Sequence, residues 1–222
     1  MVIVGVGGEP NVELAADGGI ALGETGAIAT DQYGRTNYEN IYAAGDCAEA
    51  INVVTGEADY VPLALTANRA GRAIGQTVTG TPTDVGEIAS TAIVKAFDLG
   101  AARTGIIDEA RARGLGFDPI SVEITAPTRS EYYPGAEEVT VALVDDTPSE
   151  RILGASVVGP QGAKRIDTVA TALHAGLTVT DVEQLDLAYA PHLAPSGIRS
   201  QQQRKYSGAR LMRQHNTGSV RN

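Results

Sequence analysis

The stretch TNYENIYAAGD, residues 36–46, decides how the first half of this 222-residue sequence is interpreted. Residues 41–44 predict a short apolar strand that delivers Gly45 and Asp46 to its C-terminal end. A glycine at that place allows a ligand to approach the backbone closely, and a carboxylate accepts hydrogen bonds from a sugar-like hydroxyl. The same residues also fit a strand that ends in a tight turn and binds nothing. Composition alone leaves both interpretations open.

Short apolar runs separated by turns surround this stretch. We expect a buried strand over residues 2–6, a short helix over residues 11–16 and another short strand over residues 28–30. Residues 63–74 are rich in alanine and follow Pro62, which favours a helix. The pattern changes near residues 80–83, so the sequence predicts an α/β domain over residues 1–82.

The second part of the chain has a different pattern, in which strands and helices do not alternate regularly. Strands are expected where β-branched residues gather, over residues 91–97, 121–125, 139–143 and 152–158. Helices are expected over residues 108–113, 163–175 and 181–185, with Gly176 after the second and Thr180 as the N-cap of the third. This order predicts an α+β domain with an antiparallel sheet over residues 83–205, and residues 206–222 are expected to form a disordered tail.

Composition excludes several classes of protein. The sequence is 43% apolar, but no run of about 18 apolar residues is present, so no membrane-spanning helix is expected. The formal charge of −10 argues against nucleic acid and anionic membrane surfaces as partners. One cysteine rules out an internal disulfide, which favours a cytoplasmic protein. An acidic chain with only 3 lysines also fits a halophilic, high-salt cytoplasm.

The stretch 36–46 resembles the second flavin motif of the pyridine nucleotide-disulphide oxidoreductases. That motif has a threonine, followed after a few residues by isoleucine, an aromatic residue, alanine, any residue, glycine and aspartate. The matching positions here are Thr36, Ile41, Tyr42, Ala43, Gly45 and Asp46. The resemblance implies that Asp46 binds the ribityl chain of FAD and that the complete enzyme uses FAD and NAD(P)H.

The sequence on both sides of the motif resembles the same family. Residues 4–11 are similar to the segment by which the family's chain returns from its nicotinamide domain to its flavin domain. Residues 61–64 and 68–72 resemble the helix that follows the motif, so Pro62, Leu63 and Ala64 would face the flavin. A helix N-terminus has free N–H groups and partial positive charge, which would stabilise negative charge on reduced flavin. Without the resemblance, these residues fit an ordinary amphipathic helix.

Two tyrosine segments in the second half resemble the NADH oxidase and coenzyme A-disulphide reductase group of the family. They are SEYYPG, residues 130–135, and LAYAP, residues 187–191. In that group tyrosines from the dimerisation domain reach the active site of the partner subunit, which implies a homodimer with Tyr133 and Tyr189 as catalytic residues. Tyr132 is the alternative to Tyr133. On the residues alone, the first segment equally fits a turn with packed aromatic side chains.

The remaining reactive side chains carry weaker signals. Cys47 is expected to be structural, because Glu49 rather than a cationic group lies near it in the sequence. The three histidines have no metal-ligand spacing, so no metal site is expected, and His192 alone is a candidate for catalysis. Residues 192–199 also depart from the pattern of the group, which leaves the substrate open.

The family's N-terminal nucleotide-binding region, nicotinamide domain and redox cysteine have no counterpart in these 222 residues. The sequence therefore predicts the C-terminal flavin-binding and dimerisation portion of an FAD-dependent NAD(P)H oxidoreductase. Its acceptor would be a disulphide, such as coenzyme A disulphide, or oxygen, and its partner a missing N-terminal portion. The alternative is a catalytically inactive, standalone dimerisation or scaffold module. A third interpretation, a ferredoxin or nitrite reductase component, does not account for the tyrosine segments.

Overall fold

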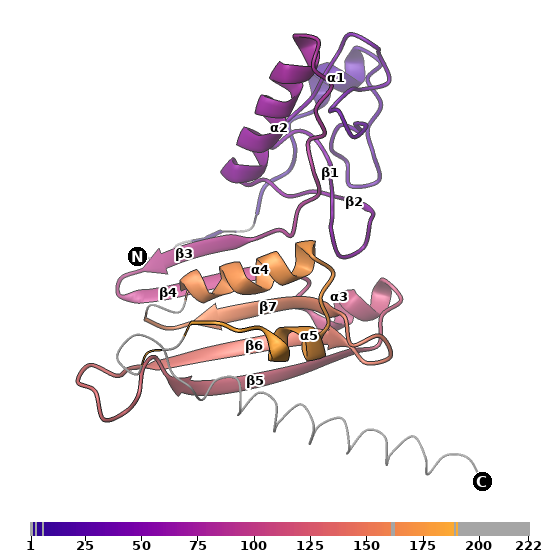
Figure 1. Cartoon of the computed structure of the whole chain (residues 1–222). Coiled ribbons are helices and arrows are strands. Elements are labelled where there is room, and N and C mark those ends of the chain that lie inside the picture. The colour runs from indigo at the N-terminus through magenta and orange to yellow at the C-terminus, as the bar shows by residue number, and fades with distance from the viewer. Residues whose placement is uncertain (1, 3, 6, 161–162, 189, 191–222) are drawn as a thin grey trace. The chain divides into compact units, whose positions relative to one another are not determined.

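The computed structural model divides the chain into two compact units, Met1–Ser90 and Thr91–Asn222 (Figure 1). It describes all residues except 1, 3, 6, 161–162, 189 and 191–222. The predicted tail, residues 206–222, lies outside the described residues. Sequence patterning placed the boundary between residues 82 and 83, whereas the first unit extends to Ser90. The reason is backbone pairing: the N–H of Ile88 donates to Ile51 at 2.8 Å, and the N–H of Val53 donates to Ile88 at 2.9 Å.

The first unit has little regular structure among its described residues. It contains α1 (Glu13–Asp17), the antiparallel pair β1 (Ala50–Ile51) and β2 (Ala58–Asp59), and the long helix α2 (Ala64–Val78). The predicted helices over residues 11–16 and 63–74 are thus confirmed, with shifted ends. Buried Asn52 holds the turn after β1, because its side chain donates to Asp59 at 2.8 Å and accepts from the N–H of Val54 at 2.9 Å.

The prediction of short strands in the first unit is wrong, because the described residues of these runs form isolated bridges or no pairing at all. Ile28 makes isolated bridges to Leu22 and Ala48, and Tyr42 bridges only to Arg35. The described residues 2, 4 and 5 of the predicted buried strand 2–6 form no strand, and the side chains of Val2 and Val4 are exposed. Each of these runs is apolar enough for a strand, but among the described residues none has a neighbour that pairs with it along its length.

The second unit is built on a five-stranded antiparallel sheet, as the sequence predicted (Figure 1). Its strands are β3 (Ala92–Ala96), β4 (Leu99–Gly105), β5 (Pro119–Pro127), β6 (Glu138–Asp146) and β7 (Ile152–Val158). Their order across the sheet is β3-β4-β7-β6-β5. β5 and β6 alternate between buried and more exposed side chains over most of their length, so one face of these two strands is buried more deeply than the other.

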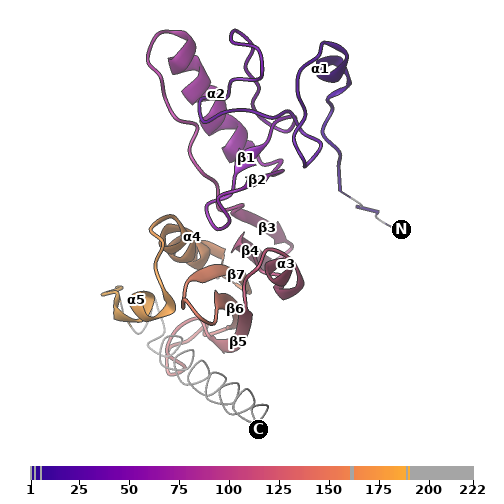
Figure 2. The same ribbon diagram turned by 90° about the vertical axis from the view of Figure 1, so that its right-hand side faces the viewer.

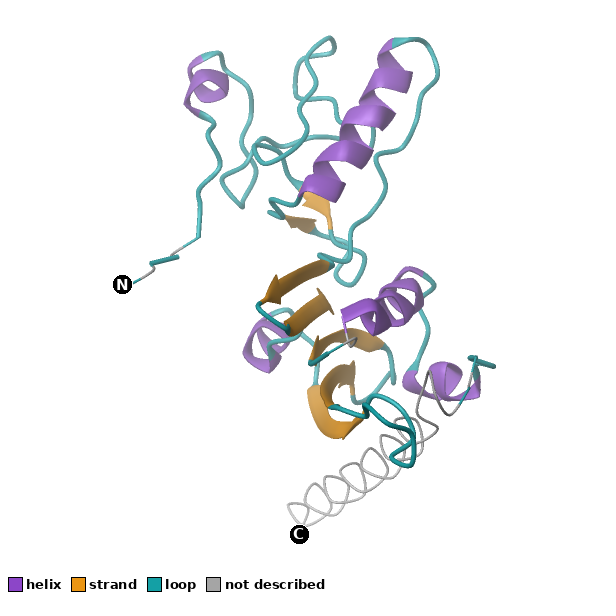
Figure 3. Cartoon of the chain, turned by 90° about the vertical axis from the view of Figure 1, so that its left-hand side faces the viewer, coloured by secondary structure: helices purple, strands orange, loops and turns teal. Residues whose placement is uncertain are grey.

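Helices lie on both sides of this sheet. They are α3 (Glu109–Gly114), the 3₁₀ turn η1 (Ala163–Arg165), α4 (Ile166–His174) and α5 (Val179–Gln184). α4 packs on β4 and β7, while α3 contacts β5, and the two helices lie on opposite sides of the sheet (Figures 2 and 3). The buried side chains of Ile166 and Leu173 in α4 and of Val157 in β7 contribute to the core.

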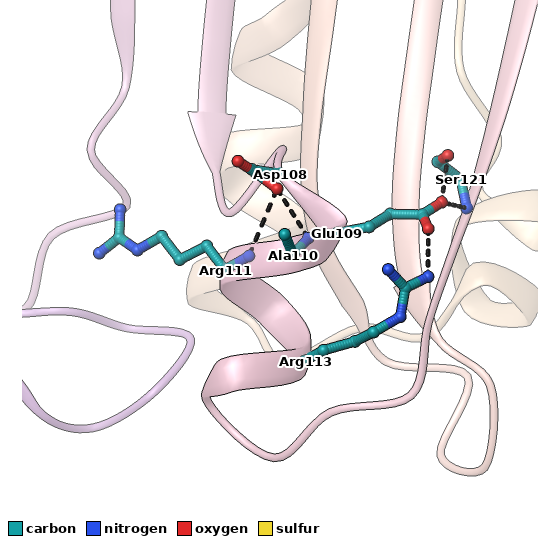
Figure 4. A network of polar contacts seen from close by, with 6 residues as sticks. All are labelled: Asp108, Glu109, Ala110, Arg111, Arg113 and Ser121. Carbon is teal, nitrogen blue, oxygen red and sulfur yellow. Dashed lines mark hydrogen bonds and ion pairs between the residues drawn. The ribbon is translucent and has the colours of Figure 1, made fainter.

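Side-chain caps explain where two helices begin. The carboxylate of Asp108 accepts from the N–H of Ala110 at 2.7 Å and of Arg111 at 3.3 Å (Figure 4). Asp108, which the sequence placed inside a helix over residues 108–113, is therefore the N-cap of α3. Thr180 was expected to cap the last helix, but Thr178 does so instead. Its hydroxyl accepts from the N–H of Asp181 at 3.1 Å, and the Asp181 carboxylate accepts in return from the N–H of Thr178 at 2.9 Å. The Thr180 hydroxyl donates to Glu150.

Candidate functional site: a glycine turn against a helix N-terminus

A tight hairpin-like segment delivers the motif residues. The Asp31 carboxylate accepts from the N–H groups of Tyr33 at 2.8 Å and Arg35 at 2.9 Å, which turns the chain. Thr36 closes the next turn, because its N–H donates to Ile41 at 2.9 Å and its hydroxyl donates to the same carbonyl at 3.1 Å. The first residue of the motif therefore fixes the turn that returns the chain towards Gly45.

Gly45 lies against the first turns of α2. Its φ of +89° is in the left-handed region that favours glycine. A Cβ built on Gly45 would lie 3.7 Å from the Cβ of Ala67, with no other heavy atom within 4 Å apart from its chain neighbours. The next residue, Asp46, has an exposed side chain. The structure thus places the backbone turn at Gly45 beside the N-terminal part of α2, and an exposed carboxylate follows it in the chain.

The N-terminus of α2 is uncapped within the described part of the chain. Leu63 precedes the helix with extended backbone angles and gives no side-chain cap, while exposed Pro62 comes before it. The first intrahelical bond runs from the N–H of Ala67 to Leu63 at 3.0 Å. The N–H groups of the first turn, Ala64 to Thr66, have no partner among the described residues and are available to a ligand.

These elements enclose a shallow pocket that combines the motif with α2. It is lined by Ala43, Ala44, Gly45, Thr66, Arg69 and Ala70, among others. The structure therefore brings together Gly45 and the start of α2, which the sequence had linked only through the family motif.

A second depression follows α2 on its polar side, and the sequence did not single it out as a site. Its lining includes Asn68, Arg72 and Gln76, which follow one another at intervals of four on one helix face, together with Thr83 and Asp84. Arg69 lines both depressions, and its guanidinium donates to the carbonyl of Glu87 at 3.1 Å. The spacing of Asn68, Arg72 and Gln76 was the available signal. The loop residues that complete the depression come from a segment assigned to the second domain.

The first tyrosine segment lies in the second unit, in the loop between β5 and β6. The side chain of Tyr132 is 76% exposed and that of Tyr133 is 37% exposed, and their ring centroids are 5.1 Å apart. The N–H of Tyr133 donates to Ser130 at 2.9 Å, which gives the loop a local turn. Tyr189 and His192 lie outside the described residues.

The remaining candidates that the structure describes are Cys47 and the possible metal ligands. The Cys47 side chain is half-buried, and its sulfhydryl donates to the carbonyl of Ala44 at 3.6 Å. Within the residues that the structure describes, no group of three or more His, Cys, Asp or Glu side chains could hold a metal ion. No helix in that part of the chain is both long and apolar enough to cross a membrane.

Comparison with known proteins identifies the class. The model of the pyridine nucleotide-disulphide oxidoreductases matches residues 1–71, and the model of their dimerisation domain matches residues 91–198. The chain belongs to the pyridine nucleotide-disulphide oxidoreductase family, whose members are FAD-dependent, and within it to the group of NADH oxidases and coenzyme A-disulphide reductases.

Particular relatives are similar along most of the chain. An NAD(P)H coenzyme A polysulfide/persulfide reductase of Pyrococcus horikoshii is 42% identical over 195 residues, which are 88% of this chain and 44% of the relative. A coenzyme A disulfide reductase of Staphylococcus aureus is 35% identical over 86% of this chain and 43% of the relative. The structure of an NAD-dependent persulfide reductase from A. fulgidus has a TM-score of 0.84 at 41% identity, covering 90% of this chain and 38% of that one. The chain thus spans less than half the length of these relatives.

Proposed function

We propose that this chain is the C-terminal flavin-binding and dimerisation portion of a cytoplasmic, homodimeric, FAD-dependent NAD(P)H oxidoreductase. Its acceptor would be a disulphide- or persulphide-type sulphur compound, such as coenzyme A disulphide, with oxygen as the other acceptor. A nucleotide-binding portion of the kind the family has would complete the enzyme. The observation that carries the proposal is the placement of Gly45 against the uncapped first turn of α2.

The residues of this site fit a flavin. The left-handed backbone at Gly45 leaves space for close approach, and the exposed carboxylate of Asp46 can accept hydrogen bonds from ribityl hydroxyls. The free N–H groups of Ala64 to Thr66, together with the partial positive charge of the helix N-terminus, would stabilise negative charge on the ring. Bound FAD would supply the transfer of hydride and electrons, while these residues hold and orient it.

The depression beside α2 supports an acceptor that carries phosphate. Arg69 and Arg72 supply positive charge that exceeds the single carboxylate of Asp84, and Asn68 supplies an amide. Together they suit a phosphate-bearing substrate better than a neutral one. The names of the Pyrococcus horikoshii and Staphylococcus aureus relatives include coenzyme A, whose pyrophosphate has that chemistry. The phenol of Tyr133 would donate a hydrogen bond to the sulphur or oxygen of the acceptor. Tyr189 would do the same from the second segment.

The alternative is a dimerisation module that binds no flavin. A flavin titration separates the two functions. The chain is titrated with FAD while flavin fluorescence is followed, and the mass in solution is measured by light scattering. A colourless dimer that leaves FAD fluorescence unchanged would support the module.

The residue-level test compares Asp46→Ala with Asp17→Ala, an exposed carboxylate at the end of α1. We expect Asp46→Ala to weaken FAD binding by about 10-fold or more, since a hydrogen bond to a charged group contributes about 1.5–3 kcal/mol. Asp17→Ala should bind as the unmodified chain does. Equal affinities of the two variants would refute the role of Asp46.

A further inference from the structure

The loop that carries Tyr132 and Tyr133 closes at its base, where β5 ends and β6 begins. The N–H of Thr128 donates to Glu137 at 2.7 Å, and the N–H of Glu137 donates to the Thr128 hydroxyl at 3.2 Å. Thr128 is buried, with 2% of its surface exposed. The base of the loop is therefore fixed, while the side chain of Tyr132 at its tip is 76% exposed.

A residue from a distant part of the chain reaches this base. Arg165 lies at the end of η1, directly before α4, and its guanidinium donates to the carbonyl of Thr128 at 2.9 Å across 37 residues of sequence. The Arg165 side chain is partly buried, and burial lowers its pKa from the ordinary value. Among the described residues, no carboxylate lies within ion-pair distance of it.

The partial burial of the Arg165 guanidinium costs free energy, and its hydrogen bond to the carbonyl of Thr128 offsets part of that cost. Removing a cation partly from water is unfavourable, and a charged donor on a carbonyl offsets that cost better than a neutral one. The bond also ties the start of α4, a helix packed on β4 and β7, to the start of the loop. Inside the loop, the contact of Arg129 with the carbonyl of Pro134 is longer, at 3.4 Å.

We infer that Arg165 is a positioning residue for the tyrosine loop, holding residues 128–137 so that Tyr133 and Tyr132 are presented in one arrangement. The inference rests on the proposed function in one respect only: the use of these tyrosines towards an acceptor. The mechanical part, an arginine before α4 that sets the order of the loop between β5 and β6, concerns this unit alone.

The test compares Arg165→Met, which keeps the length of the side chain without the donor, with Arg165→Lys, which keeps one donor. Amide hydrogen exchange is measured by mass spectrometry on peptides covering residues 128–137, and peptides covering β7 serve as the reference. We expect Arg165→Met to speed exchange of the loop about 10-fold while β7 is unchanged, since it loses a charged hydrogen bond. Arg165→Lys should restore the rate to within about threefold.

Near-ultraviolet circular dichroism provides a second readout on the tyrosines themselves. The chain has 8 tyrosines and no tryptophan, so Tyr132 and Tyr133, at 5.1 Å between rings, contribute visibly to this signal. Tyr132→Phe measures the contribution of Tyr132 and of its contact with Tyr133, and Arg165→Met should remove a similar share. Unchanged loop exchange in Arg165→Met would overturn the inference, as would equal acceleration of loop and β7, which would mean a role in the whole fold. Neither measurement needs flavin, so a failure of the proposed function would leave both results standing.

Discussion

The carboxylate of Glu109 accepts two hydrogen bonds from Ser121, from its N–H at 3.1 Å and from its hydroxyl at 2.5 Å (Figure 4). The same carboxylate pairs with Arg113 one turn further along α3. Glu109 thus connects the first turn of α3 to the strand β5. These contacts hold the pKa of Glu109 below its ordinary value, the hydroxyl of Ser121 first and Arg113 after it, against the opposing effect of partial burial.

This network predicts a pH-dependent part of the stability. Because the folded-state pKa is lowered, the stabilisation is complete above the ordinary value of 4.5 and is lost as the pH falls through the folded-state value. Glu109→Gln should lower the free energy of unfolding by about 1 kcal/mol at neutral pH, a modest figure for a partly exposed group, and by less under acid conditions. Urea melts at several pH values measure this difference in the free energy of unfolding. Ser121→Ala should cost more than Arg113→Met, and the reverse order would contradict the assignment.

The two threonines at the start of α5 predict a second contrast. Thr178→Ala removes the half of the capping box that its hydroxyl accepts, while the bond from its N–H to Asp181 can remain, and should lower stability by about 1–2 kcal/mol. Thr180 is the second residue of α5. Thr180→Ala loses only the hydrogen bond to Glu150 and should lower stability by less. Thermal melts of both variants decide the point, and a larger loss in Thr180→Ala would return the cap to the residue that the sequence suggested.

Two glycines with left-handed backbone, Gly105 and Gly116, distinguish the cost of backbone strain from the cost of steric crowding. A Cβ on Gly105, with φ of +66°, would lie 2.2 Å from the carbonyl oxygen of Leu153, whereas one on Gly116, with φ of +88°, would meet nothing within 4 Å. Gly116→Ala should therefore cost only the backbone term of about 1–2 kcal/mol. Gly105→Ala should cost more than about 4 kcal/mol, because the backbones of β4 and β7 must move apart. Denaturant melts giving equal losses would contradict this.

Tyr133 and Tyr132 provide a matched pair for catalysis in the completed, flavin-loaded enzyme. Tyr133→Phe should lower turnover with a disulphide acceptor by about 10-fold or more, as expected for a lost donor to developing charge. Tyr132→Phe, with the more exposed side chain, should have little effect. Steady-state rates with NAD(P)H and coenzyme A disulphide measure both. The opposite ranking would assign the donor role to Tyr132. Unchanged turnover in both variants would show that neither tyrosine of this loop is the donor.

The acidic surface predicts a salt response. With 27 acidic and 17 basic residues, repulsion between carboxylates opposes folding at low ionic strength. At about 1 M KCl the screening length falls to about 3 Å, so the melting temperature should rise steeply between low salt and molar KCl. Calorimetry in a KCl series tests the halophilic interpretation, which an unchanged melting temperature would refute.

Local patterns in the sequence predicted those elements that local interactions specify. Residues 152–158 match β7 from end to end, because a run of β-branched and apolar residues suits a central strand. β4 was missed because LGAARTG, residues 99–105, lacks β-branched residues apart from Thr104, and its strand character comes from pairing with β3 and β7. Pairing is a property of the folded chain that no window of sequence contains.

The same distinction applies to the site. Gly45 and the start of α2 were predicted because a family motif names them, and the structure places them together. The depression of Asn68, Arg72 and Gln76 needs the loop at Thr83 and Asp84, which the predicted domain boundary had separated from the helix. Arg165 could not have been found, since its partner is 37 residues away and its chemistry is that of any surface arginine until the fold buries it.

The order β3-β4-β7-β6-β5 also has a consequence that we expect during synthesis, because the last strand made lies at the centre of the sheet. The hairpins β3–β4 and β5–β6 can each form from neighbouring sequence, but they share no edge until β7 is inserted between β4 and β6. Until Val158 has left the ribosome, the nascent chain therefore has two separate hairpins. Each has an unpaired edge that can pair with other chains. Translation arrested shortly before this strand should leave chains that aggregate, whereas arrest well beyond it should allow the continuous five-stranded sheet to form.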